Sequence, residues 1–275
     1  MKDAITEHMK YQTMIHDLNQ MSKQEINQEL VTMGCKMSYD EIKESLAHTY
    51  NELAISDQIF KQDSIKEGRY PVSFIDEAVL EIAIRENFGF LHYGILSNQI
   101  RDIMEPSISN SEKIKLGVSC FKKLCQTAEK FDISALETID YQVHDDLDLY
   151  ASLMTFLDLM MQEAEKDKQL YRTIVDLCER LLKTFSKSYP LLRISIQYEQ
   201  ATAYVRMKSK KGEQLFLHLL KVHSDPCDVV LHYALAYLDQ DEKRAIRILH
   251  KYQNLWNKES EAYEVIMQIL KDCEH

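Results

Sequence analysis

The side chains that could do chemistry are scattered along this chain instead of gathering in motifs. Its six glycines stand singly, so no glycine cluster would let the backbone approach a phosphate group closely. The ten histidines include no HExxH motif, and His218 and His223 are five residues apart, which places their rings on different sides of a helix. The segment from Gly117 to Ser119 lacks the second glycine of a nucleophile elbow. The sequence therefore predicts no catalytic residues, no metal site and no cofactor.

One acidic segment could in principle bind a cation. His144 is followed by Asp145, Asp146 and Asp148, and imidazole and carboxylate groups are both metal ligands. The same acids also suit the N-terminal end of a helix that starts near Leu147, because a carboxylate there interacts favourably with the helix dipole. We interpret this segment as a polar link that leads into a helix.

Composition argues against several classes of protein. The 33 basic and 44 acidic residues give a formal net charge of −11, which repels nucleic-acid phosphates and anionic membrane surfaces. No apolar run reaches the roughly 18 to 20 residues of a membrane span, and the N-terminal residues lack the apolar core of a signal peptide. The six cysteines show no disulfide spacing. We expect a cytoplasmic protein with reduced cysteines and no membrane partner, and a nucleic-acid partner is disfavoured.

The elements that carry these side chains are predicted to be helices throughout. Glycine and proline total ten residues, where average usage would give roughly thirty in a chain of this length. Apolar residues recur at helical spacing, as over residues 114–128 and 245–256. Three helix starts are indicated by a serine with a glutamate three residues later, at Ser22 and Glu25, Ser38 and Glu41, and Ser134 and Glu137. We expect about fourteen helices with short links, which makes an all-α chain of antiparallel helix hairpins.

The link richest in polar and turn-forming residues covers residues 62–72. It marks an expected boundary between an N-terminal helical unit, residues 1–62, and a second domain, residues 73–275. The composition of the link leaves open whether the two are continuous, because a polar connection can join helices of one core as well as separate two domains.

A recurrence toward the C-terminal end indicates an internal repeat. Ala201 and Tyr204 are matched 33 residues later by Ala234 and Tyr237. In each pair the small residue and the tyrosine lie on one helix face, where the small residue admits a neighbouring helix and the ring fills the adjacent space. A second amphipathic helix follows each pair, so the pattern predicts two successive helix hairpins.

This recurrence resembles the tetratricopeptide repeat, whose helix pairs carry small residues where the helices cross, an aromatic residue three positions later and often a proline at the end. The matching residues are Ala201, Tyr204 and Pro226 in one unit and Ala234, Tyr237 and Ala245 in the next. The family's glycine-containing turn is replaced by residues 208–212 and 239–241. The resemblance is strongest over residues 190–256 and implies an irregular solenoid of stacked hairpins over residues 73–275.

The resemblance also implies a function. The first helices of such hairpins line a groove that binds a peptide or a protein segment. In this register the groove residues would be Asn98, Gln99, Tyr198, Thr202 and Arg206. The amides could pair with a ligand backbone and Arg206 with a carboxylate. Cytoplasmic peptide-pheromone receptors of Gram-positive bacteria and their phages are similar in being acidic and all-helical. We expect a non-enzymatic adaptor or peptide-sensing regulator, with a homodimer through exposed end helices left open.

Two alternatives remain from other classes of protein. Residues 23–50 have the outline of a DNA-binding helix-turn-helix, with a turn near Gly34. Their three lysines, Lys23, Lys36 and Lys43, are outnumbered by five acidic residues, which disfavours DNA. The other alternative is a helical enzyme whose catalytic residues are dispersed along the chain. Such an enzyme should gather acids or histidines with shifted pKa values in a closed pocket.

Overall fold

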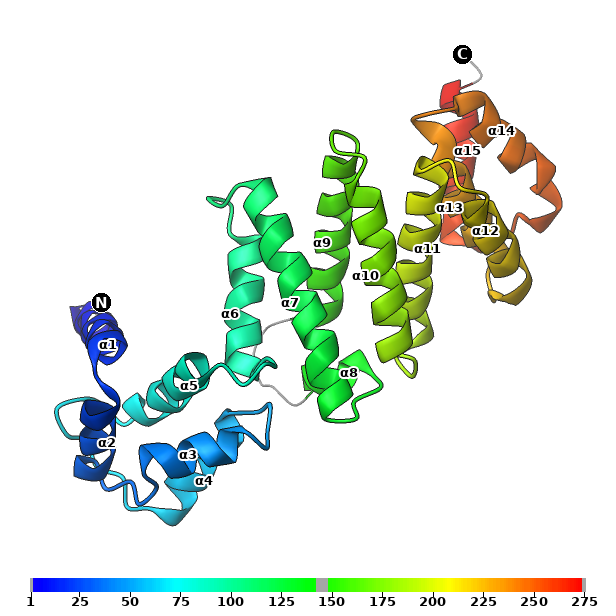
Figure 1. Cartoon of the computed structure of the whole chain (residues 1–275). Helices are drawn as coiled ribbons and strands as arrows, with labels where there is room; N and C mark the ends of the chain where they lie inside the picture. Colours follow the sequence, from blue (N-terminus) through cyan, green and yellow to red (C-terminus); the bar gives the residue numbers. More distant parts are fainter. Residues whose placement is uncertain (1, 142–147, 274–275) are drawn as a thin grey trace. The chain divides into compact units, whose positions relative to one another are not determined.

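A computed structural model describes residues 2–141 and 148–273, with side chains described for 7–140 and 148–273. Within these ranges the chain forms fifteen α-helices, one short 3-10 helix and no β-strand (Figure 1), which confirms the all-α prediction. None of the helices in these ranges combines the length and the apolar character needed to cross a membrane.

The helices form two compact units. Unit 1 contains residues up to Ile108 and the segment Ser119–Ile133, whereas unit 2 contains Ser109–Val118, Ser134–Asp140 and the residues from Asp148 onward. The helices of unit 1 are α1 (Lys2–Gln20), α2 (Lys23–Thr32), α3 (Tyr39–Leu46), α4 (Leu53–Gln62), α5 (Phe74–Glu86), α6 (Tyr93–Met104) and the second part of α7 (Asn110–Lys130).

Unit 1 has a core that continues across the link at residues 62–72. Helix α5 lies against α1, α3, α4 and α6, so side chains from before and after the link share one hydrophobic cluster. The link itself contributes Tyr70, whose ring stacks on Phe74 with centroids 5.0 Å apart. Asp63 accepts a hydrogen bond from the Lys36 backbone N–H at 2.8 Å. Residues 1–62 are therefore packed against the helices that follow, and their independent role stays a prediction.

Two of the three predicted helix starts have the expected capping geometry. At Ser22 and at Ser38 the serine side chain accepts the backbone N–H of the glutamate three residues later, and that glutamate accepts the serine N–H. Such reciprocal caps satisfy donors that the first helical turn leaves unpaired. At the third site α8 (Leu136–Tyr141) starts later, and Glu137 instead accepts the backbone N–H of Tyr189 at 2.7 Å. The Leu136 backbone N–H, at the first residue of α8, donates to the Ser188 hydroxyl at 2.8 Å, so a residue distant in sequence replaces the local cap.

Unit 2 is built from helices that are neighbours in sequence and pack on one another. Helix α11 lies against α9, α10, α12 and α13 (Figure 1), so it is the central helix of this unit. The helices and their bounds are α8, α9 (Leu149–Ala164), α10 (Leu170–Thr184), α11 (Pro190–Arg206), α12 (Lys210–Val222), α13 (Pro226–Leu238), α14 (Glu242–Lys251), the 3-10 helix η1 (Gln253–Leu255) and α15 (Glu261–Cys273).

Helices α9 and α11 run in the same direction. The Tyr150 hydroxyl, in the first turn of α9, lies 3.3 Å from the Ser195 hydroxyl, in the second turn of α11. At the other end, Glu165 follows the last residue of α9 and pairs with Arg206, the last residue of α11, at 3.5 Å. Start meets start and end meets end, so the two helices are parallel.

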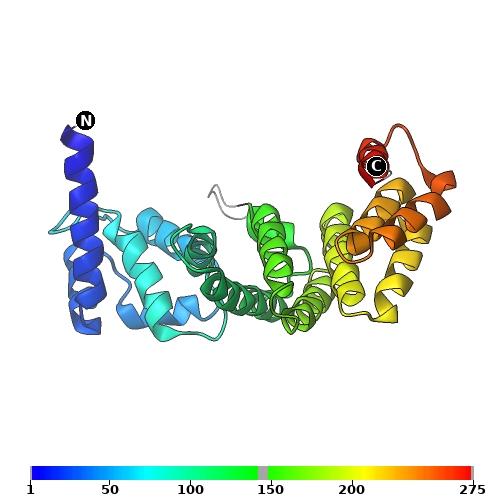
Figure 2. The same ribbon diagram turned by 90° about the horizontal axis from the view of Figure 1, so that it is seen from above.

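Helices α11 and α13 are parallel by the same criterion, and all three helices lie side by side (Figure 2). The Tyr198 hydroxyl donates to Asp228 in the first turn of α13 at 2.7 Å. Arg206 also pairs with Asp239, the residue after α13, at 2.8 Å. The chain therefore returns through α10 and α12 and presents every second helix in one direction.

The tyrosines of the 33-residue recurrence occupy matching surroundings. The Tyr204 hydroxyl donates to Glu179 of α10 at 2.8 Å, and the Lys211 ammonium lies 5.5 Å from the Tyr204 ring centre. One hairpin later the Tyr237 hydroxyl donates to Glu213 of α12 at 2.9 Å. The Arg244 guanidinium of α14 lies 4.2 Å from the Tyr237 ring centre. Ala201 and Ala234 are both buried. The sequence recurrence is thus a recurrence of contacts.

Candidate functional site

The five residues predicted to form a groove are divided between the two units. Asn98 and Gln99 lie on α6 in unit 1. Tyr198, Thr202 and Arg206 lie on α11 in unit 2, at a spacing of four residues. The structure therefore brings the last three together on one helix.

Arg206 is held by acids of its own unit. Its side chain is only 7% exposed, and the guanidinium forms ion pairs with Asp239 and Glu165. The Tyr171 hydroxyl donates to the same Glu165 carboxylate. The guanidinium donates a hydrogen bond from Nη2 to Asp239 at 2.8 Å, whereas its Nη1 lies 3.5 Å from the Glu165 carboxylate. The guanidinium thus connects the C-terminal ends of α9, α11 and α13.

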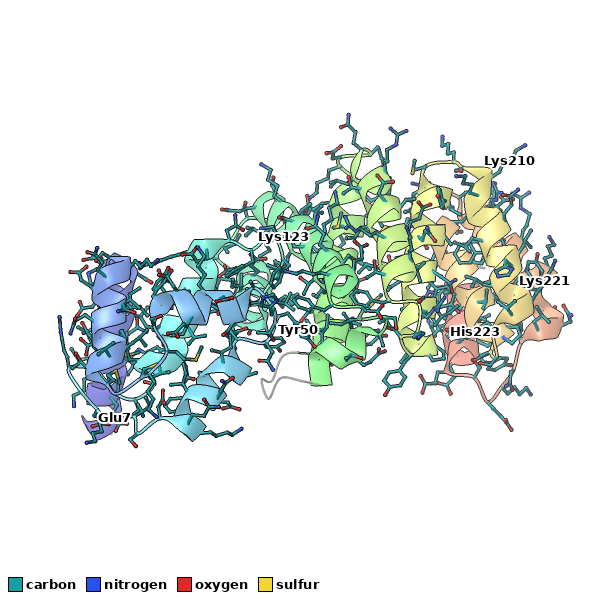
Figure 3. All side chains as sticks on the ribbon, turned by 60° about the horizontal axis from the view of Figure 1, so that its bottom comes forward. Glu7, Tyr50, Lys123, Lys210, Lys221 and His223 are labelled. Carbon is teal, nitrogen blue, oxygen red and sulfur yellow. The ribbon has the colours of Figure 1, made fainter. Side chains whose placement is uncertain are left out.

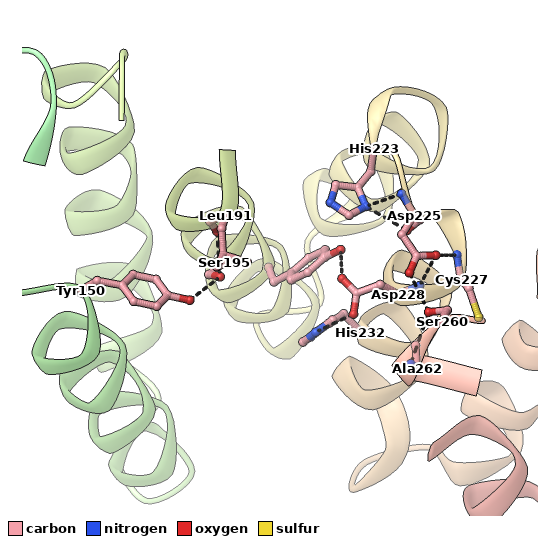
Figure 4. A network of polar contacts seen from close by, with 11 residues as sticks. Tyr150, Leu191, Ser195, His223, Asp225, Cys227, Asp228, His232, Ser260 and Ala262 are labelled. Carbon is pink, nitrogen blue, oxygen red and sulfur yellow. Dashed lines mark hydrogen bonds and ion pairs between the residues drawn. The ribbon is translucent and has the colours of Figure 1, made fainter. Parts of the chain in front are cut away.

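Tyr198 is buried between α11 and α13. Its ring stacks on the His232 imidazole with centroids 4.0 Å apart and an interplanar angle of 15°. Its hydroxyl donates to Asp228 (Figure 4). Burial lowers the pKa of His232 below its ordinary value of 6.5. The neighbouring Asp228 carboxylate raises this pKa in part, and His223 lowers it further. The imidazole is therefore neutral at pH 7 and can either donate or accept a hydrogen bond.

A network around Asp225 fixes the start of α13 (Figure 4). The Asp225 carboxylate accepts the backbone N–H groups of Cys227 and Asp228, and the Ser260 hydroxyl donates to it at 2.6 Å. The His223 ring contacts the backbone of Asp225 at 2.8 Å through Nδ1 (His223 is labelled in Figure 3). Since Asp228 is placed by this cap, the network also positions the acid that binds the Tyr198 hydroxyl.

Glu199 and Thr202 of α11 have no hydrogen bond or ion pair with any described residue, and both are half-buried. Burial raises the pKa of Glu199 to about 7, and repulsion from the Asp158 carboxylate of α9 adds to the effect. We call Ser195, Glu199 and Thr202, with Asp158 and His232 beside them, the α11 face. It offers a ligand an acid that titrates near neutral pH, a free hydroxyl and a neutral imidazole.

A cavity of about 520 Å³ lies in unit 1 between α1, α4, α5 and α6, and Asn98 lines it. We call it the α6 pocket. Its volume is in the range of small-molecule sites. Glu52, just before α4, closes one side of it and is only 2% exposed. Arg101 also lines the pocket and donates a hydrogen bond to the Asn98 side chain at 3.3 Å.

The Glu52 carboxylate holds the first turn of α6. It accepts the backbone N–H groups of Tyr93 at 2.9 Å and of Gly94 at 2.5 Å. Glycine is required at position 94, because a Cβ there would collide with the Glu52 carboxylate and lie 2.9 Å from a Leu80 methyl group. Burial raises the pKa of Glu52 above its ordinary value of 4.5, while the two backbone hydrogen bonds oppose the change. Both oxygens of this carboxylate are thus hydrogen-bonded to the backbone of α6.

The region with a helix-turn-helix outline has its lysines in ion pairs. Lys23 pairs with Asp40 at 2.5 Å and Lys36 with Asp63 at 3.1 Å. Lys43 pairs with a glutamate at the end of α5, Glu86. Because contacts to DNA phosphates need basic groups that can exchange their counterions for the phosphates, this arrangement gives no support to a DNA interface.

Metal ligation finds no support among the residues with described side chains, which contain no group of three or more His, Cys, Asp or Glu arranged to hold an ion. Of the acidic segment at residues 144–148 only Asp148 falls within them. Its carboxylate accepts the backbone N–H of Ala151 at 2.8 Å and so caps α9. This is the role that the sequence interpretation gave to the acids of that segment.

Comparison of the chain with protein-family models, with curated proteins and with solved structures gave no match.

The sequence interpretation selected Thr202 and Tyr198 but overlooked Glu199 and His232. A signal for Glu199 exists in the sequence, since it lies four residues after Ser195 and three before Thr202, on one side of a helix. His232 gives no such signal, because its partner is on another helix.

Proposed function

We propose that this chain is a non-enzymatic helical-repeat protein that binds a peptide, or a segment of a partner protein, on the α11 face. The observation that carries the proposal is the parallel alignment of α9, α11 and α13, with Glu199 and Thr202 left unpaired between them. Every second helix in one direction is the arrangement expected of stacked hairpins, whose first helices line a binding surface. The recurring tyrosine contacts support the same tetratricopeptide-like register.

Recognition on this face would rest on hydrogen bonds to an extended ligand. The Thr202 hydroxyl and the neutral His232 ring can pair with peptide N–H and C=O groups. Glu199 can accept an N–H group of the ligand and would lose its proton more readily beside a cationic one. Arg206 would keep the three helices in register, and Tyr198 would orient the His232 ring.

We infer that the biological role of the chain is that of a cytoplasmic adaptor or a peptide-sensing regulator. The net charge of −11 favours partners with basic segments, because complementary charge accelerates and selects association. A homodimer is compatible with this function and is not required by it.

The test compares partner binding by the parent and by two threonine variants. Thr202→Trp places a bulky ring on the α11 face, and Thr173→Trp places the same ring on α10, outside the three parallel helices. Each protein is used to capture partners from native cytoplasmic extract, and a captured polypeptide is then titrated as a synthetic segment by calorimetry. We expect Thr202→Trp to weaken binding at least about tenfold and Thr173→Trp to leave it unchanged.

Undiminished binding by Thr202→Trp would remove the α11 face from the proposal. Recovery of nucleic acid or of a small metabolite without any polypeptide would instead favour the DNA-binding or the enzymatic alternative. Thermal unfolding of both variants, measured beforehand, separates a blocked surface from an unfolded protein.

A further inference from the structure

The α6 pocket of unit 1 has no part in the proposed peptide-binding face. It is formed within one unit, by α1, α4, α5 and α6, and it encloses about 520 Å³. Natural ligand pockets of this size combine mainly apolar walls with a few polar groups that fix the orientation of the ligand. The composition of its walls therefore indicates what it would take.

The apolar part of the pocket includes the ring of Tyr11, which is 38% exposed, whereas Tyr93 is only 3% exposed. Tyr11 of α1 and Tyr93 of α6 both line the cavity, together with Ile15, Leu53 and Leu80. The face of a tyrosine ring carries negative potential and attracts cations that come within about 6 Å of it. These walls suit a ligand with a hydrocarbon body and a positive charge.

The charged part of the pocket is mostly acidic. Asp76 and Glu77 of α5 line it, with Glu52 beyond them and Arg101 as the opposing cation. The Tyr11 hydroxyl donates to Glu77 at 2.5 Å and so fixes that carboxylate at the wall. Asp76 has no hydrogen bond or ion pair with any residue of the described ranges and is half-buried. Its negative charge therefore has no partner among the described side chains.

We propose that the α6 pocket binds a small organic ammonium ion, with the ammonium group against Asp76 and Glu77 and the hydrocarbon body against the Tyr11 ring and the apolar side chains that line the pocket. An ammonium group supplies the hydrogen-bond donors that Asp76 lacks, and a partly desolvated carboxylate binds such donors more strongly than a fully hydrated one does. A carboxylate ligand is repelled by Asp76 and Glu77, and a neutral analogue gains only the contacts of its body.

Three probes with the same aromatic body test the charge preference on the full chain: the phenethylammonium ion, 2-phenylethanol and 3-phenylpropionate. Calorimetric titration is expected to show the ammonium ion binding at least about tenfold more tightly than the alcohol, with the carboxylate weakest. Amide chemical shifts in NMR spectra should change for residues of α1, α5 and α6.

Two aspartate variants locate the charge. Asp76→Asn keeps the shape of the side chain and should weaken ammonium binding about tenfold while leaving the alcohol unchanged. Asp57→Asn is the matched control, because Asp57 is exposed on α4 and does not line the pocket. Leu80→Trp should fill the cavity and abolish binding of all three probes.

Equal affinity for the three probes would overturn the proposal, and so would ammonium binding that survives Asp76→Asn. A failure of the ammonium ion to bind at millimolar concentration would overturn it as well. Thr202→Trp, on the α11 face of unit 2, should bind the ammonium probe like the parent. The outcome is therefore independent of the fate of the peptide-binding proposal.

Discussion

At the scale of single residues, Glu199 links structure to solution behaviour. Its pKa is raised to about 7, mainly by burial and further by Asp158. The pKa of this carboxyl in the unfolded chain is the ordinary 4.5, so the folded chain binds the proton more tightly. The resulting contribution to stability is complete below pH 4.5. It is lost as the pH rises through 7.

Glu199→Gln should consequently stabilise the protein at pH 8 by about 2 kcal/mol, allowing for the partial exposure of the side chain, and change little at pH 4.5. Urea unfolding of parent and variant at both pH values measures this difference. Glu112→Gln, at an exposed position of α7, serves as the control. A variant equally stabilised at both pH values would contradict the raised pKa.

Contacts between distant residues limited what the sequence could predict at this scale. Helical periodicity selected Thr202 and Arg206 as residues of one face, and α11 carries both. It could not predict that Arg206 would be enclosed by Glu165 and Asp239, because those partners lie 41 and 33 residues away. Their approach depends on how α9 and α13 pack, which no local pattern encodes.

At the scale of elements, the close packing of α7 on α9 depends on a glycine. A Cβ at position 117 would collide with the Phe156 ring. Elsewhere in a helix, glycine is about 1 kcal/mol less favourable than alanine. Glycine at this position therefore lowers helix propensity but allows the two helices to approach closely. In the sequence, Gly117 stands out only as part of an incomplete nucleophile elbow.

Gly117→Ala is expected to destabilise the protein by about 1 to 3 kcal/mol despite the better helix propensity of alanine. The cause is overpacking against Phe156, so Phe156→Leu in the same chain should recover part of the loss. A double-mutant cycle measured by chemical unfolding gives the coupling between the two positions. Additive effects would show that the two side chains do not compete for space.

Helix boundaries were predictable where the cap is local. Ser22 and Ser38 cap their helices as expected, because both partners lie within four residues. The site at Ser134 differs because the side chain of Glu137 binds Tyr189, 52 residues away. Composition likewise signalled the all-α class, since helices need few glycines and prolines, whereas the direction of alternate helices follows from packing alone.

At the scale of the whole molecule, two hydrophobic clusters among the described residues have separate sets of side chains. One contains residues between Met14 and Ala83 and the other contains residues between Ile194 and Leu270. Buried side chains between these ranges, such as Phe121 and Leu181, belong to neither cluster. Composition marked residues 62–72 as a boundary, but it could not show that Tyr70 packs into the first core. A polar link and a domain boundary look alike in sequence, because both avoid apolar residues.

A cavity in one core should therefore loosen that core first. Ile26→Ala removes a fully buried side chain from unit 1 and Leu249→Ala removes one from unit 2, each at a cost of about 2 to 5 kcal/mol. We expect hydrogen exchange to accelerate by at least about tenfold in the helices of the altered unit and less in the other. Each variant is the control for the other, and equal acceleration everywhere would indicate one cooperative unit.

The link at residues 62–72 also bears on how the chain could be divided. Asp63 is bound to Lys36, and Arg69 and Tyr70 are both bound to Asp17. Both ends of the link are thus bound to residues that precede it, one in the turn between α2 and α3 and one in α1. Cleavage of a peptide bond between Ser64 and Gly68 would leave two fragments that stay associated, and residues 1–62 could complement the remainder when supplied as a separate polypeptide.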